Sequence, residues 1–341
     1  MKPDFAARQR RLKALVQKSG LNAVITSDPH DVFYYTGYAG LKDDRIFMLF
    51  QDSGRPKLFV SPLENDAASK YPDITYIRDK DDFIRQLGGF KRMGYDERTL
   101  SLLLFRAMKK KLKARLEPAG KIMEIPRIQK DEFEIAQIKE AIRLTGDVLQ
   151  NVGGFLWGNS EKQIADAIEI EYRKRGASES FESIVCAGKQ AAFVHHKPGE
   201  TLAKAKAPVL IDTGCIVDCY CSDITRMFFT RLGPVQKKIY EDVKQIHDEL
   251  IYAARAGVTY SELEDLQKKL YAKKSYTVLH GLGHGLGLSV HEPQGETLAE
   301  NTVMTIEPGV YIKGIGGVRL EDVILIKKKR TEVLSKDIPI F

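Results

Sequence analysis

Four carboxylates in the second half of the chain interrupt segments that otherwise resemble β-strands. In residues 207–230 (APVLIDTGCIVDCYCSDITRMFFT), Asp212 and Asp223 occupy the two halves of an apparent hairpin. If this hairpin turns between Val217 and Asp218, then Asp212 and Asp223 face each other across the antiparallel ladder. Like charges opposed on a half-buried sheet are destabilising unless a cation compensates them. The pair therefore points to a metal site.

Residues 302–326 repeat this arrangement. Glu307 and Glu321 lie symmetrically about Gly314, which belongs to the turn-like run KGIGG. We therefore expect a second pair of facing carboxylates. Two such pairs of uncompensated acids are the strongest physical argument in the sequence for bound cations.

A glycine-rich run with histidines lies between the two carboxylate pairs. It reads HGLGHGLGLSVHE over residues 280–292, and its glycines let the backbone approach another group closely. We take His284 as the nitrogen ligand. Four carboxylates and one imidazole suit Mn²⁺ or Co²⁺, and also Zn²⁺, and shared carboxylates hold two ions roughly 3.5–4 Å apart. The sequence thus predicts a dinuclear metal site.

Each of these residues also has an ordinary structural interpretation. A single Asp in a strand commonly marks a bulge or an edge, and a His in a Gly-rich loop often bonds only backbone. Five potential ligands in order on two hairpins and one loop are harder to explain in that way. Other catalytic motifs fail, because Gly281 replaces the Glu that a zincin helix needs and no G-x-S-x-G elbow is present.

Two regions of different pattern must position these residues. In the first, the apolar spacing predicts a helix that ends at Gly20. Short runs then predict strands at 23–26, 46–50 and 58–60, helices at 82–87 and 100–116, and a last strand at 122–125 before Pro126.

The second region begins with two longer helical patterns. These cover about 131–152 and 160–175, and strands that carry most of the unusual polar residues follow them. We therefore expect an α/β (α+β) chain with one domain at 1–125 and a second, which holds the catalytic residues, at 126–341.

Composition excludes several classes of protein. The net charge is +7, but its basic runs at 109–113 and 327–330 read as solvated surface, so no nucleic-acid partner is expected. The longest apolar runs are far too short to span a membrane, and the N-terminus lacks the apolar core of a signal peptide. Four cysteines are too few for a disulfide scaffold, so we expect reduced thiols in the cytoplasm.

The sequence resembles the creatinase/prolidase branch of the pita-bread metallopeptidases over nearly its whole length. The runs that carry the resemblance are, in order, DTG at 212–214, YCSDITR at 220–226, HGLGHGLGLSVHE at 280–292, TIEPG at 305–309 and GGVRLED at 316–322. They resemble the five metal-ligand blocks of that family. The run SDPHDVFYYTGY at 27–38 is similar to the N-terminal domain of its aminopeptidase P and prolidase members.

The resemblance implies a role for each matching residue. Two divalent metals would be held by Asp212, Asp223, His284, Glu307 and Glu321. His195, in AAFVHHKPG, and His291, in SVHEP, would line the substrate pocket and support the tetrahedral intermediate, and the neighbouring His196 remains an alternative to His195.

The implied reaction is hydrolysis of the peptide bond before proline by a metal-activated water. Glu307 would move the proton, and Arg319 would either support the ligands or bind the substrate's carboxylate. Proline-containing peptides are the expected partners, with a homodimer as the common state of relatives and manganese or cobalt as the metal.

One departure from the family pattern bears on substrate length. Prolidases restricted to dipeptides commonly place an arginine shortly after the second histidine, whereas residues 292–296 here read EPQGE. This favours an Xaa-Pro aminopeptidase that accepts longer peptides over an Xaa-Pro dipeptidase (prolidase). A catalytically inactive peptide- or protein-binding module is the alternative of another class, and the intact set of five ligands argues against it.

Overall fold

The computed structural model describes residues 2–39, 46–51, 55–64, 71 and 74–339. The chain divides into two compact units, Met1–Arg127 and Ile128–Phe341. The predicted boundary after residue 125 falls inside a helix, α6 (Gly120–Ile128), which also contains the division between the units. No helix in the described part of the chain is long and apolar enough to cross a membrane.

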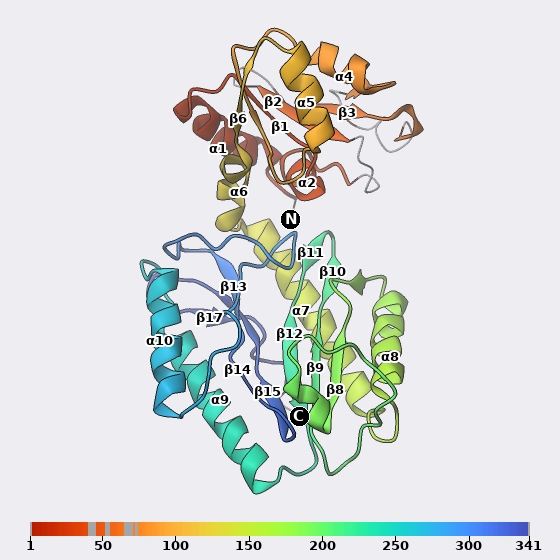
Figure 1. Ribbon diagram of the computed structural model, residues 1–341, viewed down its shortest axis with the longest axis vertical. Helices are drawn as coiled ribbons and strands as arrows, with labels where there is room; N and C mark the ends of the chain where they lie inside the picture. The colour runs from red at the N-terminus through yellow and green to blue at the C-terminus, as the bar shows by residue number, and fades with distance from the viewer. Residues whose placement is uncertain (1, 40–45, 52–54, 65–70, 72–73, 340–341) are drawn as a thin grey trace. The chain divides into compact units, whose positions relative to one another are not determined.

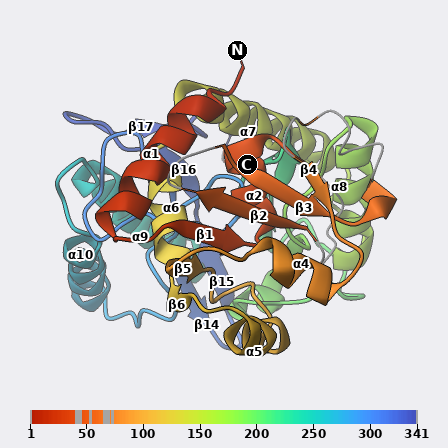
Figure 2. The same ribbon diagram turned by 90° about the horizontal axis from the view of Figure 1, so that it is seen from above.

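The first unit is built on a mixed sheet. Its strands lie in the order β4-β3-β2-β1-β5-β6, and Figure 2 shows β1, β2 and β3 side by side. These strands are β1 (Ala23–Thr26), β2 (Phe47–Gln51), β3 (Lys57–Val60), β4 (Ile74–Tyr76), β5 (Arg92–Tyr95) and β6 (Arg115–Pro118). Its helices are α1 (Phe5–Lys18), α2 (Pro29–Thr36), α4 (Lys80–Gln86) and α5 (Leu102–Lys111), with a 3₁₀ turn at Pro62–Glu64.

The core of the first unit follows the alternation of its strands. Ile25, Phe47 and Phe59 pack with Phe83 of α4 and Met108 of α5 in one buried cluster. The rings of Phe47 and Phe83 stack with centroids 4.3 Å apart. The apolar periodicity of α4 and α5 is therefore what fixes them against this sheet.

Two of the predictions for this unit are wrong. The strand predicted at 122–125 is part of helix α6, and the helix predicted at 100–116 ends at Lys111. The last strand is β6, which pairs in parallel with β5. A short apolar run is compatible with either element, and here the hydroxyls of Tyr34 and Tyr35 bind backbone carbonyls of α6 and hold it as a helix.

The second unit places helices along two groups of strands, as Figure 1 shows. On one side are α7 (Glu132–Gly153) and α8 (Glu161–Lys174), both with capping boxes, and on the other are α9 (Pro234–Ala253) and α10 (Tyr260–Lys273). The capping pairs Asp131 with Glu134 and Ser160 with Gln163 explain why α7 and α8 begin within a residue of the predicted starts.

The strands of this unit form short antiparallel sheets. One has the order β12-β9-β8, with β8 (Ile184–Ala187), β9 (Val209–Thr213) and β12 (Ile224–Phe228), and another has β13 (Val303–Ile306), β16 (Asp322–Leu325) and β17 (Glu332–Val333). Shorter strands are β7 (Ser178–Glu179), β10 (Cys215–Val217), β11 (Tyr220–Cys221), β14 (Gly309–Ile312) and β15 (Gly316–Arg319), and a 3₁₀ turn covers Gly188–Ala192.

The two halves of this unit are joined at the strands that carry the acidic residues. The backbone N–H of Glu321, just before β16, points to the carbonyl of Thr225 in β12 at 3.4 Å, and the Arg226 guanidinium donates to the Glu321 carbonyl at 2.7 Å. The carboxylates of the two hairpins are therefore brought to one place by strand contacts between the sheets.

Candidate metal centre

The first hairpin turns one residue later than its sequence suggests. Val217 pairs with Tyr220, and the two residues between them, Asp218 and Cys219, have φ values of 46° and 71°. Positive φ at both central residues is typical of tight two-residue hairpin turns. The prediction that Asp212 directly faces Asp223 is therefore wrong.

The corrected register pairs Asp212 with Thr225. Because side chains alternate along a strand, a register shift of two keeps Asp223 and Thr225 on the same face. Asp212 and Asp223 are thus diagonal neighbours on one face of the sheet. The sequence pattern predicted the shared face correctly and the partner wrongly.

The second hairpin has the predicted register. Gly309 pairs with Arg319 on one side of the acidic residues and Ile306 pairs with Asp322 on the other, which places Glu307 opposite Glu321. The predicted centre at Gly314 is also confirmed.

The carboxylates form a buried cluster of like charge. Burial, followed by repulsion from Glu321, Asp212 and Glu307, raises the pKa of Asp223 well above its ordinary range, and burial with repulsion from Glu307 does the same to Glu321. Burial raises the pKa of Glu307 to about 7, against the attraction of Arg319. Without cations, the cluster therefore favours protonated acids.

His284 lies beside the acidic residues of both hairpins. Its Nε2 is 3.5 Å from Oδ2 of Asp223 and 3.6 Å from Oε1 of Glu307, while its Nδ1 is 3.1 Å from the carbonyl of Gly285. Donation from Nδ1 to that carbonyl leaves Nε2 as the ligand atom. Burial, together with neighbouring His291, lowers the pKa of His284 to about 4, so the ring is neutral and able to bind metal.

The backbone next to His284 requires glycine. Gly283 has φ 149°, and a Cβ there would lie 2.2 Å from the carbonyl oxygen of Thr305. The backbone N–H of His284 donates to the Thr305 hydroxyl at 3.1 Å. The close contact of Gly283 with β13 therefore places the His284 imidazole beside the carboxylates.

The donor set fits divalent metals. Ligand atoms of Asp223, His284 and Glu321 all lie within 4.8 Å of one another. Among the described residues, Oδ1 of Asp212 is a buried atom with no hydrogen-bond partner, although its carboxylate belongs to the same cluster. Buried polar atoms are ordinarily paired, and an unsatisfied carboxylate oxygen beside further oxygen and nitrogen donors is what a metal would complete.

A second acidic group lies in the first unit, where guanidinium groups already compensate it. Asp28, Asp31 and Asp96 offer atoms within the same 4.8 Å limit. Arg98 pairs with Asp96 at 2.8 Å, and Arg127 pairs with the fully buried Asp31 at 2.8 Å. These ion pairs explain the acids as structural partners of the arginines.

Arg319 is bound to residues of the cluster by all three of its nitrogens. Nη2 donates to Asp212, Nε to Thr225 at 3.0 Å and Nη1 to the hydroxyl of Tyr311 at 2.9 Å. Burial disfavours the cation, but Asp212 holds the pKa of Arg319 well above its ordinary value. Arg319 is 3% exposed, so this geometry favours its predicted role in supporting the ligands over that of binding a substrate carboxylate.

The adjacent histidines His195 and His196 have different surroundings. Nε2 of His196 is 2.7 Å from Oε2 of Glu161, a fully buried carboxylate that also accepts the backbone N–H of Gly199. His195 is exposed. It lies close enough to His280 to lower the pKa of that imidazole, after the larger effects of burial and Arg319. His196 is thus held by Glu161, and His195 stays the predicted pocket histidine.

The second predicted pocket histidine lies directly beside the ligand histidine. The rings of His291 and His284 have centroids 4.1 Å apart. His291 is itself exposed, whereas His284 is partly buried. The loop therefore presents one ring to the carboxylates and the other to solvent.

The sequence analysis missed three residues of the site. Nε2 of His280 is 2.9 Å from the Tyr311 hydroxyl and Nδ1 is 3.9 Å from Glu307, while the Thr225 hydroxyl donates to Glu321 at 2.8 Å. Strand alternation could have found Tyr311 and Thr225, because they lie an even number of residues from Glu307 and Asp223. His280 could have been found from its place in the same glycine-rich run.

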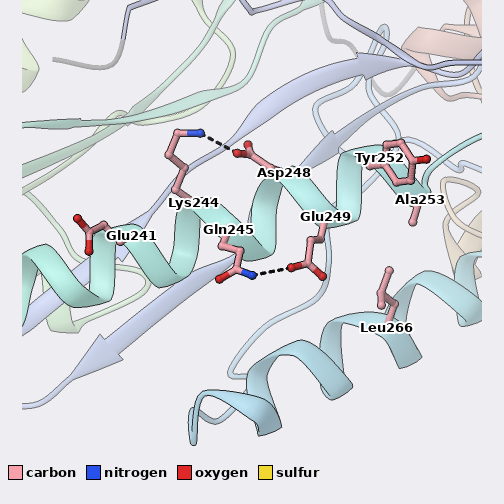
Figure 3. A pocket seen from close by; sticks show the side chains of 8 residues that line it. All are labelled: Glu241, Lys244, Gln245, Asp248, Glu249, Tyr252, Ala253 and Leu266. Atoms are coloured by element: carbon pink, nitrogen blue, oxygen red, sulfur yellow. Dashed lines mark hydrogen bonds and ion pairs between the residues drawn. The ribbon is translucent and has the colours of Figure 1, made fainter.

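A separate open hollow of about 580 Å³ lies along α9 and α10 (Figure 3). Its polar residues pair along the helix, Lys244 with Asp248 at 2.7 Å and Gln245 with Glu249 at 2.9 Å. Tyr252, at one end, is 87% exposed. The hollow is a solvated helix surface with none of the predicted ligands.

Comparison with family models agrees with this site. Residues 136–328 match the model of metallopeptidase family M24, and residues 8–129 match that of the creatinase/prolidase N-terminal domain. The first match contains all five predicted ligands.

Known proteins resemble the chain over nearly its whole length. An Xaa-Pro dipeptidase of Pyrococcus horikoshii is 30% identical over 341 residues, with 96% of each chain covered. Among solved structures, an Xaa-Pro dipeptidase from Bacillus anthracis has a TM-score of 0.91 at 28% identity, covering 98% of each chain. An X-Pro aminopeptidase from Thermotoga maritima has a TM-score of 0.86 at 27% identity, covering 97% of this chain and 98% of that one.

These matches confirm the expected fold, a creatinase-like α/β domain followed by a pita-bread catalytic domain. The chain therefore belongs to metallopeptidase family M24 and is a metallo-exopeptidase.

Proposed function

We propose that this protein hydrolyses the peptide bond between an N-terminal residue and proline, using two divalent metal ions. The ligands proposed for these ions are Asp212, Asp223, His284, Glu307 and Glu321. Manganese or cobalt is the preferred metal because carboxylate oxygens dominate the donor set, and zinc is the alternative. The similarity to proteins named Xaa-Pro dipeptidase and X-Pro aminopeptidase supports proline specificity.

The observation that carries this proposal is the buried acidic cluster around His284. Asp223 and Glu321 are 5% and 2% exposed, and both are held near other carboxylates. Burying like charges together is unfavourable without compensation, and Arg319 supplies only one positive charge to them. Of the four proposed carboxylate ligands Arg319 compensates one, and two divalent cations would more than compensate the other three.

The bound metals would supply a nucleophilic water at neutral pH and polarise the scissile carbonyl. Glu307 is the acid best placed to move protons. Glu307 is partly exposed whereas Glu321 is buried, so Glu307 would be able to reach the attacking water and then the leaving nitrogen. The exposed rings of His195 and His291 would donate hydrogen bonds to the developing oxyanion.

Substrate length is the finer part of the proposal. We favour an Xaa-Pro aminopeptidase, because no arginine follows His291 in residues 292–296 to bind the carboxylate of a dipeptide. In that stretch, the Gln294 side chain accepts a hydrogen bond from the backbone N–H of Gly285 at 3.2 Å and so stabilises the loop that carries His284 and His291. The names of the dipeptidase relatives favour the second candidate, an Xaa-Pro dipeptidase.

A series of peptides tests reaction and length together. The metal-stripped enzyme is reloaded with Mn²⁺, Co²⁺ or Zn²⁺ and assayed on Xaa-Pro, on Xaa-Pro peptides of increasing length, and on matched Xaa-Ala peptides. We expect cleavage before proline only, dependent on metal, with tripeptides and longer peptides turned over at least as well as dipeptides. Cleavage of dipeptides alone would favour the second candidate, and inactivity with every metal would favour a binding module.

A homodimer in the cytoplasm completes the proposal. Its support is the family resemblance of the sequence, which implies a homodimer, together with four cysteines that are all free thiols. Light scattering of the purified protein would test the dimer, which a monomeric mass would overturn.

A further inference from the structure

A fully buried ion pair lies beneath the loop that carries His284 and His291. Nζ of Lys130 is 3.1 Å from Oε2 of Glu292, and the two side chains are 0% and 1% exposed. Burying two charges is costly unless each is paired and further hydrogen-bonded. The surroundings of Glu292 show what this ion pair contacts.

The Glu292 carboxylate fills the inside of its own loop. Its Oε1 accepts the backbone N–H groups of Leu288 at 2.9 Å and Ser289 at 3.2 Å. A Cβ on Gly287 would lie 2.8 Å from Oε2, so only glycine leaves room for the carboxylate. The backbone closes around it, because the N–H of Glu292 donates to the carbonyl of Gly285 at 2.8 Å.

The two ends of this closed loop carry the two histidines of the site. His284 immediately precedes Gly285 and His291 immediately precedes Glu292, and their rings lie 4.1 Å apart. The loop is also joined to the acidic hairpin, since the N–H of Cys221 donates to the Gly287 carbonyl at 2.7 Å. The Glu292 carboxylate therefore fills the loop whose paired ends carry His284 and His291.

Lys130 is held at the start of β13, the strand that also binds the first half of this loop through the N–H of Leu286 and the carbonyl of Val303 at 3.0 Å. The backbone N–H of Lys130 donates to the Asn301 carbonyl at 2.9 Å, and neighbouring Gln129 bridges to Thr302, immediately before β13. The ammonium thus belongs to the segment beside the start of β13, while the carboxylate belongs to the loop. The ion pair fixes one against the other.

We propose that Lys130 and Glu292 are positioning residues that hold His291 in place to assist the reaction. This inference rests on the proposed function, in which His291 donates to the oxyanion. Loss of the lysine would remove a positive charge from beside a buried carboxylate, and the loop would rearrange to hydrate that carboxylate. Displacement of His291 by a fraction of an ångström to an ångström is enough to lower turnover.

A double-mutant cycle separates positioning from general structural support. In metal-loaded enzyme, Lys130→Met should lower kcat by roughly tenfold to a hundredfold while metal content stays unchanged. In the His291→Ala background the same substitution should have little further effect, because the residue it positions is gone. An equal fold-loss in both backgrounds, or loss of metal from Lys130→Met, would overturn the proposal.

Two further variants guard against misfolding. Glu292→Gln keeps an oxygen for the backbone donors, so the double variant Lys130→Met/Glu292→Gln should recover part of the kcat lost by Lys130→Met. Lys139→Met, which removes the lysine of the exposed ion pair with Glu332, is the matched control and should leave kcat unchanged. If the double variant is no better than Lys130→Met, an unpaired charge is not the cause and the proposal fails.

A spectroscopic measurement tests the positioning without activity. With histidine-labelled protein loaded with diamagnetic Zn²⁺, Lys130→Met should shift the ring resonances of His291, while those of His30 in the first unit stay in place. Unchanged His291 resonances would overturn the proposal. If the unaltered enzyme cleaves no Xaa-Pro peptide, the proposed function fails, yet these resonances still decide whether Lys130 positions His291.

Discussion

Arg319 donates a hydrogen bond from Nη2 to Oδ2 of Asp212, and both residues are buried. The guanidinium lies among the acids that we propose as metal ligands and also binds Thr225 and Tyr311. It therefore compensates part of the acidic charge before any metal binds, and orients Asp212 so that its other oxygen stays available.

Replacing Arg319 should destabilise the metal-free protein more than the metal-loaded one. Arg319→Leu leaves the Asp212 carboxylate without its partner, which costs about 3–5 kcal/mol for a buried pair. Arg319→Lys keeps the charge but not the fork of donors, so the stability of this variant should lie between those of the unaltered protein and Arg319→Leu. Thermal melting with and without metal checks this, and equal losses in the two states would contradict the compensating role.

Glu307 and His195 should differ when each is replaced by alanine. Glu307→Ala removes a proposed ligand and the proton path, so metal content should fall and turnover should nearly cease. His195→Ala should keep both metals and lose roughly 10²–10³ in kcat, as removal of one oxyanion donor does. Metal analysis and kinetics on the same preparations decide the matter.

His196→Ala serves as the matched comparison for His195→Ala. Because His196 binds Glu161, its loss should affect stability more than kcat. If His195→Ala lost its metals or stayed fully active, the assignment of His195 would be withdrawn.

His247 should make stability depend on pH. Burial opposes its cation, but the hydrogen bond to Asp248 and the Asp322 carboxylate, 3.2 Å from Nε2, outweigh burial and raise the pKa of His247 above the ordinary value of 6.5. The folded protein thus binds this proton more tightly than the unfolded chain. The stabilisation is complete below about pH 6.5 and is lost as the pH rises through the folded pKa.

The melting temperature of the metal-free protein measures this effect. His247→Gln should lower it more at about pH 5.5 than at about pH 9. Gln245→Ala, on the exposed side of the same helix, is the control and should change little at either pH. If the loss of melting temperature in His247→Gln grew as the pH rose, the predicted direction of the pH dependence would be wrong.

Gly214 should tolerate no side chain. A Cβ there would lie 1.9 Å from the carbonyl oxygen of Ser222, next to Asp223. Gly214→Ala must push the two strands apart, at a cost of roughly 1–3 kcal/mol, and should weaken metal binding. Gly154→Ala, whose nearest atom would lie 3.6 Å away, is the control and should change stability by less than about 0.5 kcal/mol. Equal effects of the two substitutions on stability and metal content would refute this explanation.

The sequence by itself determined which face of each hairpin is acidic. Asp212 and Asp223 share a face despite the misplaced turn, because strand side chains alternate with a period of two and the register error was two. Glu307 and Glu321 oppose each other as predicted, because the glycines around Gly314 mark that turn. Capping residues likewise marked where α7 and α8 begin.

Only the tertiary structure decided how these local elements combine. Residues 122–125 are helical because Tyr35, far away in the sequence, binds the helix backbone. His196 is distinguished from His195 by Glu161, and Lys130 meets Glu292 across 162 positions of chain. Local propensity and periodicity carry no information about such contacts, since burial and charge pairing between distant segments fix them. The sequence therefore indicated the chemistry of the site, and the fold selected the residues that support it.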